Sequence, residues 1–440
     1  MNVVVMGTGH VGLVTSVAFA RMGHTVVGTD IDGEKIAQQQ RGVPTFFEPG
    51  LEGALAEELA SGRLSFTADR AEALRTGEIV FICVGTPART DGHANLLAME
   101  HSAREIARHA PDGAVVVEKS TVPAGTADRV RLTLTREGAG KRFHVASNPE
   151  FLREGSALGD ALEPDRIVIG VGSEEGLEAL RRLYAPLTSQ GTPLIVTDIR
   201  TAELAKHASN SFLALKISFI NALARICEAA DADVTAVAEV MGSDPRIGRA
   251  FLDAGLGYGG YCFPKDVAAL ERLASTLGCD LPLLREVAAI NEQAVEAAVR
   301  KVEEAVWNVE GKTVTVLGLA FKPGTDDVRF SPALALVRRL LEEGAHVVGY
   351  DPQAGPAAKD ELPELELAAD AYAAASGADC VVLATEWDEF RRLDLRTLRE
   401  VMAHPVVVDG RNLFDPGTMA AAGFAYHPTG RPATAPLDPV

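Results

Sequence analysis

The sequence predicts an α/β protein in which two Rossmann-like, doubly wound parallel-sheet domains are joined by a central helical region with a long helix. Three observations predict this arrangement. Short Val-rich runs alternate with helical stretches over residues 1–148, and the same alternation returns from Lys312. Between them, residues 201–232 keep helical periodicity without Gly or Pro. Strands that alternate with helices form parallel sheets, because each helix carries the chain back to the start of the next strand.

The expected strands are short apolar runs that end at turn residues. The first sheet takes MNVVVM (1–6), HTVVGTD (24–30), EIVFICV (78–84), GAVVVEKS (113–120) and FHVASN (143–148). The second takes KTVTVLGLAF (312–321), AHVVGYDP (345–352), DCVVLATEW (379–387) and PVVVDGR (405–411), with a helix over 331–344. The long helix between the sheets separates two domains or pairs with a copy of itself, and a plain core helix is the alternative.

Composition narrows the class of protein. The chain has 440 residues and a formal net charge of −19, so its surface repels nucleic acid and anionic lipid. Neither a nucleic-acid nor a membrane partner is expected. The five cysteines are scattered without metal-binding spacing, which predicts reduced thiols, no metal and a cytoplasmic location. The N-terminus shows no signal-peptide pattern, and no apolar stretch reaches the ~20 residues of a membrane span.

A dinucleotide-binding turn follows the first expected strand. Gly7-Thr8-Gly9-His10-Val11-Gly12 fits G-x-G-x-x-G, between a strand and a helix. The three glycines permit the tight turn, the close approach of a pyrophosphate and the packing of helix on strand. Asp30 ends the next strand, eighteen residues after Gly12. A carboxylate there bonds ribose hydroxyls and repels a 2′-phosphate, which predicts NAD rather than NADP. The alternative is a glycine-rich turn with a solvent-exposed Asp.

Two further segments end strands of the same sheet. Val84-Gly85-Thr86-Pro87 follows one strand, and Ser120-Thr121-Val122-Pro123 follows the next. The carboxyl ends of strands in a doubly wound sheet face the ligand crevice. We therefore expect both segments to line that crevice, although either could be only a turn.

The segment Leu256–Asp266, LGYGGYCFPKD, carries the strongest chemical signal. Its glycines bring the backbone close to another part of the protein, and Cys262 follows them at once. Pro264 is well placed to begin a helix, and a thiolate is favoured at a helix N-terminus beside Lys265. Cys83, Cys227 and Cys380 lie in apolar patterns and are expected in the core.

Lys206 and Asn210 lie four residues apart on the long helix and therefore share one face. A Lys and an Asn on a mostly apolar helix belong either to a site or to the edge of the helix that faces solvent. Periodicity alone favours the solvent edge.

These segments together resemble the UDP-glucose/GDP-mannose dehydrogenase family over nearly the whole chain. The matching segments are GTGHVGL, VGTP followed by DG, STVPAGT, NPEFLREGSA, PDRIVIG, ELAKHASNSFLALKISFINALA, GYGGYCFPKD and GLAFKPGTDDVRFSP. Within the family, LAFKPGTDD and ATEWDEFR are similar to members that act on UDP-glucose. Two positions depart from the common pattern. His10 stands where Tyr is frequent, and Tyr261, next to Cys262, stands where Ser is common.

The resemblance implies a division into domains. It implies an NAD-binding domain over 1–200, a central dimerisation region with the Cys262 segment over 201–305, a UDP-binding domain over 306–428 and a flexible tail over 429–440. A homodimer or higher homo-oligomer through the central helix is implied as well.

The resemblance also implies a role for individual residues. Cys262 is the nucleophile, with Lys206, Asn210 and Asp266 as polar partners and with Thr121 and Glu150 holding water. The implied NAD contacts are Gly7, Gly9, His10, Val11, Gly12, Asp30, Lys35, Thr86, Pro87, Ser120, Thr121, Glu154, Lys265 and Arg329. The implied UDP-sugar contacts are Phe151, Leu152, Glu154, Lys206, Asn210, Arg249 from the facing subunit, Tyr258, Gly259, Phe321, Lys322 and Arg411. The basic residues among these contacts form the local positive patch that an acidic protein needs for an anionic substrate.

The implied reaction is the NAD-dependent, four-electron oxidation of UDP-glucose to UDP-glucuronate through a thiohemiacetal and a thioester on Cys262. Three alternatives stand beside it. The same chemistry could act on GDP-mannose or a UDP-N-acetylhexosamine. A two-electron β-hydroxyacid dehydrogenase would share the first two domains but would need neither the Cys262 segment nor a second nucleotide-binding domain. A non-enzymatic NAD sensor would leave Cys262, Lys206 and Asn210 unexplained.

Overall fold

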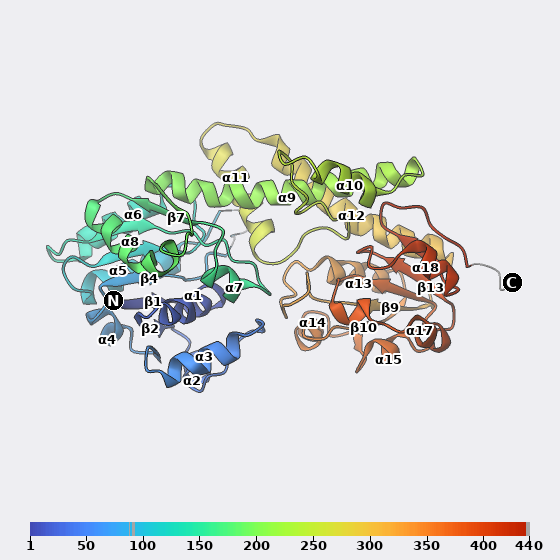
Figure 1. The fold of residues 1–440 in the computed structure, drawn as a ribbon, viewed down its shortest axis with the longest axis horizontal. Coiled ribbons are helices and arrows are strands. Elements are labelled where there is room, and N and C mark those ends of the chain that lie inside the picture. Colours follow the sequence, from blue (N-terminus) through green and yellow to red (C-terminus); the bar gives the residue numbers. More distant parts are fainter. Residues whose placement is uncertain (88, 90–92, 437–440) are drawn as a thin grey trace. The chain divides into compact units, whose positions relative to one another are not determined.

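The computed structural model describes residues 1–87, 89 and 93–436 of the chain, shown in Figure 1. The chain forms two compact units. The first contains Met1–Ser209 and Ala268–Leu277, and the second contains Asn210–Val267 and Gly278–Val440. Two helices, α9 (Ile199–Ala229) and α11 (Cys262–Thr276), each contribute residues to both units. The predicted α/β fold with two Rossmann-like sheets and a long central helix is confirmed.

The first unit is built on an eight-stranded sheet in the order β3-β2-β1-β4-β5-β6-β7-β8. All neighbouring strands are parallel except β6 and β7, which are antiparallel. The strands are β1 (Asn2–Met6), β2 (Thr25–Thr29), β3 (Leu64–Thr67), β4 (Ile79–Ile82), β5 (Val115–Glu118), β6 (His144–Ser147), β7 (Ile167–Val171) and β8 (Leu194–Thr197). The reversal at β1 places a topological switch point between β1 and β4, where such sheets bind ligands.

Helices cover both faces of this sheet. They are α1 (His10–Arg21), α2 (Gly33–Gln40), α3 (Leu51–Ala60), α4 (Arg70–Arg75), α5 (Leu97–His109), α6 (Thr126–Glu137), α7 (Ala157–Leu162) and α8 (Glu174–Thr188). Side chains alternate along a strand between the two faces. Val5 of β1 accordingly packs in one core with Leu13 and Leu180, whereas Val4 packs in another with Ile106. Apolar residues on both faces explain why these strands read as continuous apolar runs.

The second unit repeats this plan with a six-stranded, all-parallel sheet in the order β11-β10-β9-β12-β13-β14. Its strands are β9 (Thr313–Leu317), β10 (His346–Tyr350), β11 (Glu366–Leu367), β12 (Cys380–Leu383), β13 (Val406–Asp409) and β14 (Ala425–Pro428). The helices between its strands are α13 (Pro332–Glu342), α14 (Gly355–Glu361), α15 (Ala371–Ala375), α16 (Asp388–Arg391), α17 (Leu395–Val401) and α18 (Pro416–Ala421).

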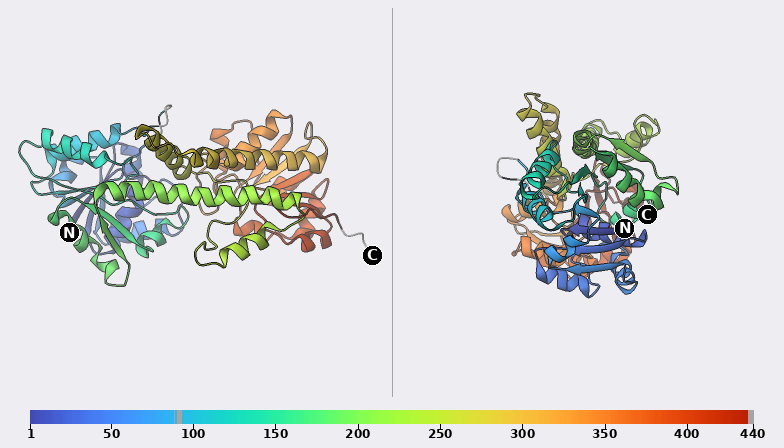
Figure 2. Two further views of the ribbon diagram at one scale, coloured as in Figure 1. Left: turned by 90° about the horizontal axis from the view of Figure 1, so that it is seen from above. Right: turned by 90° about the vertical axis from the view of Figure 1, so that its left-hand side faces the viewer.

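The other helices of the second unit are α10 (Val234–Gly242) and α12 (Pro282–Val306). Figure 2 shows α9 as one unbroken helix, and α12 runs beside its second half. Ser218 Oγ of α9 donates a hydrogen bond of 2.7 Å to the carbonyl oxygen of Val287 in α12. Among the described helices, none is both long and apolar enough to cross a lipid bilayer.

Residues after β14 continue to bond the second unit. Thr434 pairs with Tyr426 in an antiparallel bridge. The amide of Gly430 donates to Glu228 at 2.6 Å, and Arg431 pairs with Asp233 at 3.0 Å. The expected flexible tail, 429–440, therefore begins with bonded residues, and 437–440 lie outside the described part of the chain.

Candidate active site

The glycine turn after β1 depends on contacts that only glycine permits. Gly7 has φ +89°, and a Cβ on it would lie 2.7 Å from the carbonyl oxygen of Cys83. A Cβ on Gly12 would lie 1.7 Å from the carbonyl oxygen of Gly7, so α1 packs directly on the turn. A Cβ on Gly9 would meet no atom of the described residues within 4 Å. The turn is thus closed toward the protein and open at Gly9, as the close approach of a pyrophosphate requires.

The cofactor's phosphates would meet the start of α1. The helix begins at His10, and its cap residue Gly9 has no side chain to bond the first N–H groups. Such N–H groups attract anions, because they carry the positive end of the helix dipole. His10 itself stacks on Phe46, with 3.9 Å between the ring centroids. Its side chain therefore lies against the protein, while the backbone of His10 and Val11 starts the helix.

Asp30 follows β2 and supports this turn. Its Oδ2 accepts hydrogen bonds from the Thr8 amide at 2.8 Å and from Lys35 Nζ at 3.3 Å, and its Oδ1 accepts one from the Asp32 amide at 3.1 Å. Burial raises the pKa of Asp30, but the hydrogen bonds and the charge of Lys35 outweigh burial and lower it below its usual range. An ionised carboxylate beside an open glycine turn fits NAD, since it repels the extra phosphate of NADP.

The two segments that end β4 and β5 meet, as expected of neighbouring strands. Thr86 Oγ1 donates to the carbonyl oxygen of Thr121 at 2.9 Å. Ser120 Oγ donates to the carbonyl oxygen of Val84 at 2.7 Å. The carbonyl oxygen of Pro87 accepts a hydrogen bond of 2.8 Å from the amide at position 95. The Asp91-Gly92 pair that follows VGTP in the family pattern lies outside the described residues.

Glu150 and Lys206 form a buried ion pair in the first unit. Glu150 Oε1 lies 3.1 Å from Lys206 Nζ, and Glu150 Oε2 accepts the Leu152 amide at 2.7 Å. Lys206 Nζ also lies 5.2 Å from the centre of the Phe151 ring. Glu154, a little further along the same segment, is half-buried. The solvent-edge interpretation of Lys206 and Asn210 is wrong, because both side chains are buried.

In the second unit, the glycines before Cys262 pack against the chain that follows β9. A Cβ on Gly259 would lie 2.3 Å from the carbonyl oxygen of Phe330, and one on Gly260 would lie 2.7 Å from the Phe321 ring. The Tyr258 amide donates to Asn291 at 2.7 Å. The chain after β9 is thus the neighbouring segment that the glycine-rich sequence led us to expect. Its contacts hold the backbone immediately before Cys262 in place.

Cys262 is the first residue of α11 and is only partly buried. One turn later, Asp266 is fully buried and accepts hydrogen bonds from Asn210 Nδ2 at 2.6 Å and from Lys265 Nζ at 2.7 Å. A thiol at a helix N-terminus with a lysine nearby is placed where the thiolate is favoured. The second unit therefore joins Asp266 to Asn210 and to Lys265, the latter predicted as a cofactor contact, with Cys262 one turn earlier on α11.

The other described cysteines are poor candidates for a nucleophile. Burial raises the pKa of the Cys83 thiol to about 12, with Lys119 opposing the shift, and burial raises that of Cys380 to about 12 as well. Burial also raises the pKa of Cys227. These three lie in the core, as expected. Cys279 is exposed on the chain between α11 and α12.

The basic residues of the second unit differ in their surroundings. Asp327 holds the Arg329 guanidinium through two hydrogen bonds of 2.8 and 2.6 Å, and the guanidinium lies 4.6 Å from the Tyr261 ring centre. Lys322 Nζ lies 5.6 Å from the ring centre of the adjacent Phe321. Arg411 Nε donates to the carbonyl oxygen of residue 384 at 2.9 Å. Tyr261 is thus a platform for an arginine, which a serine in its place could not be.

Arg249 is bonded within its own chain. It donates to Glu239 and Asp253, each at 2.6 Å. These carboxylates hold the guanidinium on the segment that follows α10. Its expected role toward a facing subunit stays a prediction.

Sequence analysis missed buried polar groups beneath these segments. Lys119 Nζ donates to Asn148 Oδ1 at 3.0 Å, and Glu203 accepts the amides of Gly125 and Ala127 at 2.6 and 2.9 Å. Burial lowers the pKa of Lys119. The available signal was a charged pair, Glu118-Lys119, at the end of the apolar run VVV. Charges at the end of a buried strand need partners, which periodicity does not identify.

Comparison with known proteins agrees with this arrangement. Residues 1–188 match the NAD-binding domain of the UDP-glucose/GDP-mannose dehydrogenase family, residues 200–293 match its central domain, and residues 315–416 match its UDP-binding domain. The chain belongs to the UDP-glucose/GDP-mannose dehydrogenase family. It is therefore an NAD-dependent oxidoreductase.

Relatives within the family are similar over their full length. The chain is 46% identical to a UDP-glucose 6-dehydrogenase of Rhizobium meliloti (strain 1021), an alignment that covers 98% of this chain and 100% of the relative. It is 44% identical to one from Bacillus subtilis (strain 168), with 99% of each covered. The solved UDP-glucose dehydrogenase of Pyrobaculum islandicum superimposes with a TM-score of 0.87 at 43% identity, covering 93% of this chain and 94% of that one.

Proposed function

We propose that this enzyme oxidises the C6 alcohol of UDP-glucose to the carboxylate of UDP-glucuronate, with Cys262 as the covalent nucleophile. The observation that carries the proposal is the partly exposed Cys262 at the start of α11, one turn from an Asp266 that is bonded to Asn210 and Lys265. The relatives at 46% and 44% identity, both UDP-glucose 6-dehydrogenases, support the substrate.

The cofactor would be held mainly by the first unit. The backbone of the turn from Gly7 to Gly12 would bind the pyrophosphate, and Asp30, with Lys35 beside it, would bind a ribose. Bound NAD would supply the hydride acceptor for each of the two oxidations of C6. The other NAD contacts that we propose are Thr86, Pro87, Ser120, Thr121, Glu154, Lys265 and Arg329.

The first oxidation needs a base for the C6 hydroxyl proton. Asp266 and Lys206 are proposed to form that base assembly with a bound water. Each has partners that fix its position: Asn210 and Lys265 for Asp266, and Glu150 for Lys206. Lys206 and Asn210 also lie one turn apart on α9, so their polar ends can bond the same substrate oxygen.

The second oxidation explains why a thiol is needed. An aldehyde has no C–O anion to expel a hydride, whereas addition of the Cys262 sulfur to C6 gives a thiohemiacetal that does. Lys206 and Asn210 would stabilise that oxyanion. Loss of the second hydride leaves a thioester on Cys262. Water held by Thr121 and Glu150 would then hydrolyse the thioester and release the thiol and the carboxylate.

The UDP-sugar would be held by both aromatic and cationic groups. We propose Lys322 and Arg411 as ligands of the diphosphate, together with Arg249 from a second subunit. The remaining contacts proposed for the sugar and nucleotide are Phe151, Leu152, Glu154, Tyr258, Gly259 and Phe321. Two loops of the second unit support this assignment, since Gly259 and Gly260 pack on the loop that carries Phe321 and Lys322.

We further propose that the enzyme is a homodimer through α9. Phe212, Phe219 and Ile226 are exposed and stand seven residues apart on α9, so they lie on one face of the helix. An exposed apolar stripe of this kind marks an interaction surface. A Phe219→Glu variant should shift the molar mass in light scattering to that of a monomer, while Val240→Glu on α10, also exposed, serves as the control.

A panel of sugar nucleotides tests the substrate. The proposal expects kcat/KM for UDP-glucose to exceed that for UDP-N-acetylmannosamine and for GDP-mannose by at least about 100-fold, the scale of a lost polar contact plus a steric clash. Equal or greater turnover of another sugar nucleotide would mean that the same chemistry acts on that substrate instead.

The Cys262→Ser variant tests the nucleophile. It should bind NAD and UDP-glucose with unchanged affinity yet accumulate aldehyde or a trapped ester, detectable by mass spectrometry.

A further inference from the structure

The Glu118 side chain is a buried acid that faces a second carboxyl group, that of Glu203. It ends β5 and is only 1% exposed. Within the described part of the chain, neither of its carboxyl oxygens accepts or donates a hydrogen bond by ordinary geometry. An ionised carboxylate in such a place would cost several kcal/mol, about the penalty of an unpaired buried charge. Its presence therefore requires an explanation.

Glu203 of α9 provides that explanation. It is also buried, and its two oxygens accept the amides of Gly125 and Ala127 at 2.6 and 2.9 Å. These amides belong to the start of α6, whose cap residue Gly125 has no side chain to bond them. Glu203 thus caps α6 from another helix. An acceptor of two N–H bonds at a helix N-terminus is stabilised as the anion.

A third bond fastens the same segment to α9. His207, one turn after Glu203, lies with Nε2 at 2.9 Å from the carbonyl oxygen of Val122. On the other side, the carbonyl oxygen of Thr121 accepts from Thr86. The chain from Ser120 to Ala127 is therefore clamped between α9 and the segment after β4. Lys206 lies between Glu203 and His207 in sequence, so α9 positions both Lys206 and Thr121.

Electrostatics decide which carboxyl holds a proton. Burial, and then the charge of Glu203, raise the pKa of Glu118 well above its usual range. Burial also raises the pKa of Glu203, but its two amide donors oppose the shift. Asp128 of α6 also acts on both carboxyl groups, and it is offset by ion pairs with Arg131 and Arg200. Arg200 acts on Glu203 as well, and the titratable His207 lies one turn further along α9.

We propose that Glu118 is a neutral carboxylic acid that turns its proton toward the ionised Glu203, and that this pair positions the segment that carries Thr121. One proton is held between the two carboxyl groups and is not passed to the substrate. Glu118, Glu203 and His207 are positioning residues under this proposal. The catalytic part rests on the proposed function, because it is there that Thr121 holds the hydrolytic water.

Stability as a function of pH tests the pair without any substrate. The folded-state pKa of Glu118 is raised, so its stabilising effect is complete below the unfolded pKa of about 4.3 and is lost as pH rises toward the folded value. Glu118→Gln keeps a donor for Glu203 but cannot titrate. The melting temperature of the variant relative to wild type should therefore rise with pH above about pH 5, until the folded pKa of Glu118 is reached. A constant or falling difference would overturn the proposal.

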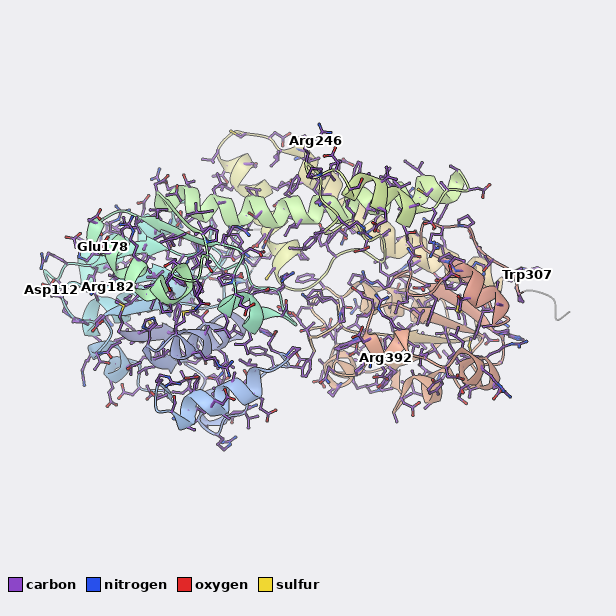
Figure 3. All side chains as sticks on the ribbon, viewed as in Figure 1. Asp112, Glu178, Arg182, Arg246, Trp307 and Arg392 are labelled. Atoms are coloured by element: carbon purple, nitrogen blue, oxygen red, sulfur yellow. The ribbon has the colours of Figure 1, made fainter. Side chains whose placement is uncertain are left out.

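The control is Glu178→Gln, a carboxamide exchange on the surface of the same unit. Glu178 is exposed on α8 and is labelled in Figure 3. Its difference from wild type should not change with pH. Should Glu118→Gln not fold, the infrared spectrum of the wild type at about pD 6.5 gives the answer, because exposed carboxyls are already ionised there. Absence of any protonated-carboxyl band would then overturn the proposal.

Enzyme kinetics test the positioning role. In Glu203→Gln, the amide NH2 faces a backbone N–H of α6 that needs an acceptor, so the segment that carries Thr121 is held less well. The kcat should therefore fall by about 10-fold or more, while the KM for NAD should change less. In wild type, kcat should fall as pH rises and Glu118 loses its proton. The Glu118→Gln variant, which cannot lose this proton, should not show that fall in kcat. An identical alkaline profile in the two proteins would refute the positioning role. Failure to oxidise UDP-glucose, with the stability result intact, would refute only the proposed function.

Discussion

The six strands of the second sheet follow the order of the first six strands of the first sheet, but the two sheets connect their first strand to the next helix in different ways. In the first unit, residues 7–9 alone separate β1 from α1, and the helix starts at the glycine turn. In the second unit, residues 318–331 separate β9 from α13. The short turn offers a nucleotide the backbone N–H groups of a helix. The long connection instead carries Lys322 and Arg329, so it offers side-chain cations.

One structural device is nevertheless common to both. Asp30 follows β2 and accepts the amide of Thr8 at 2.8 Å. Asp351 follows β10 and accepts the amides of Leu319 and Ala320 at 2.7 and 3.0 Å. In each sheet a carboxylate after the second strand therefore holds the loop after the first. The fold therefore supplies the carboxylate that holds the loop in both sheets, while the length and residues of the loop decide how an anion is bound.

The largest expected effect comes from two glycines, Gly12 in the first turn of α1 and Gly318 in the loop after β9. A Cβ on Gly12 would lie 1.7 Å from Gly7 O, and one on Gly318, where φ is +94°, would lie 2.4 Å from the Thr385 Cβ. Overpacking of this degree costs about 3 kcal/mol, or about 100-fold in affinity. By calorimetry, Gly12→Ala should lose NAD binding and keep UDP binding, and Gly318→Ala should do the reverse.

A suitable control is Gly53→Ala in α3, where an added Cβ meets no described atom within 4 Å. It should bind both nucleotides like wild type. Loss of both nucleotides from each of the two test variants would break the comparison, because it would mean that the two loops do not act independently.

A smaller effect is expected at the cations of the long connection. If Lys322 binds the diphosphate, Lys322→Ala should raise the KM for UDP-glucose by about 10- to 100-fold, the scale of a lost hydrogen bond to a charged group, and leave the KM for NAD nearly unchanged. Lys312→Ala removes a lysine that pairs with Asp379 at the start of β9 and serves as the control. Steady-state kinetics against each substrate would measure this, and equal KM values in the two variants would exclude Lys322 as a ligand.

A still smaller effect is expected at Asp30. Asp30→Ala should weaken NAD binding by about 10-fold, as expected for the loss of one hydrogen-bonded carboxylate. It should also reduce the enzyme's preference for NAD over NADP. The folded state lowers the pKa of Asp30, so its support of the turn is present above its ordinary pKa of about 4 and is lost as pH falls through the folded value. Kinetics with both cofactors would measure the preference, and an unchanged NAD:NADP ratio would argue against a ribose contact.

Sequence patterns predicted the strands that are buried on both faces. The Val-rich runs at β1, β4, β5, β9, β12 and β13 were found because both faces demand apolar residues. The sequence analysis did not identify β3, β7, β8, β11 or β14. Ile195 and Val196 of β8 are exposed at the sheet edge, and β11 has only two residues. Neither segment therefore shows the pattern of apolar residues that marks a buried strand. The antiparallel direction of β7 has no local signal.

The site was predictable where chemistry is local. The glycine turn, Asp30 and the segment from Gly257 to Asp266 were found because glycines, a cysteine and charges follow one another within a few residues. Interactions between distant segments were not predictable. Glu203 reaches Gly125 and Ala127 across 78 and 76 residues of sequence, and burial of Lys206 depends on Glu150 from another element. Helical periodicity gives the face of a side chain but not what covers that face.

The stoichiometry of the reaction tests the central claim most directly. NADH formed per UDP-glucose consumed should be counted by absorbance and chromatography, with wild type and Cys262→Ser measured in parallel. Covalent catalysis by Cys262 predicts two NADH per sugar for wild type, with UDP-glucuronate as the product, and no sustained turnover for Cys262→Ser. One NADH per sugar in the wild type, or wild-type turnover by Cys262→Ser, would contradict covalent catalysis by Cys262.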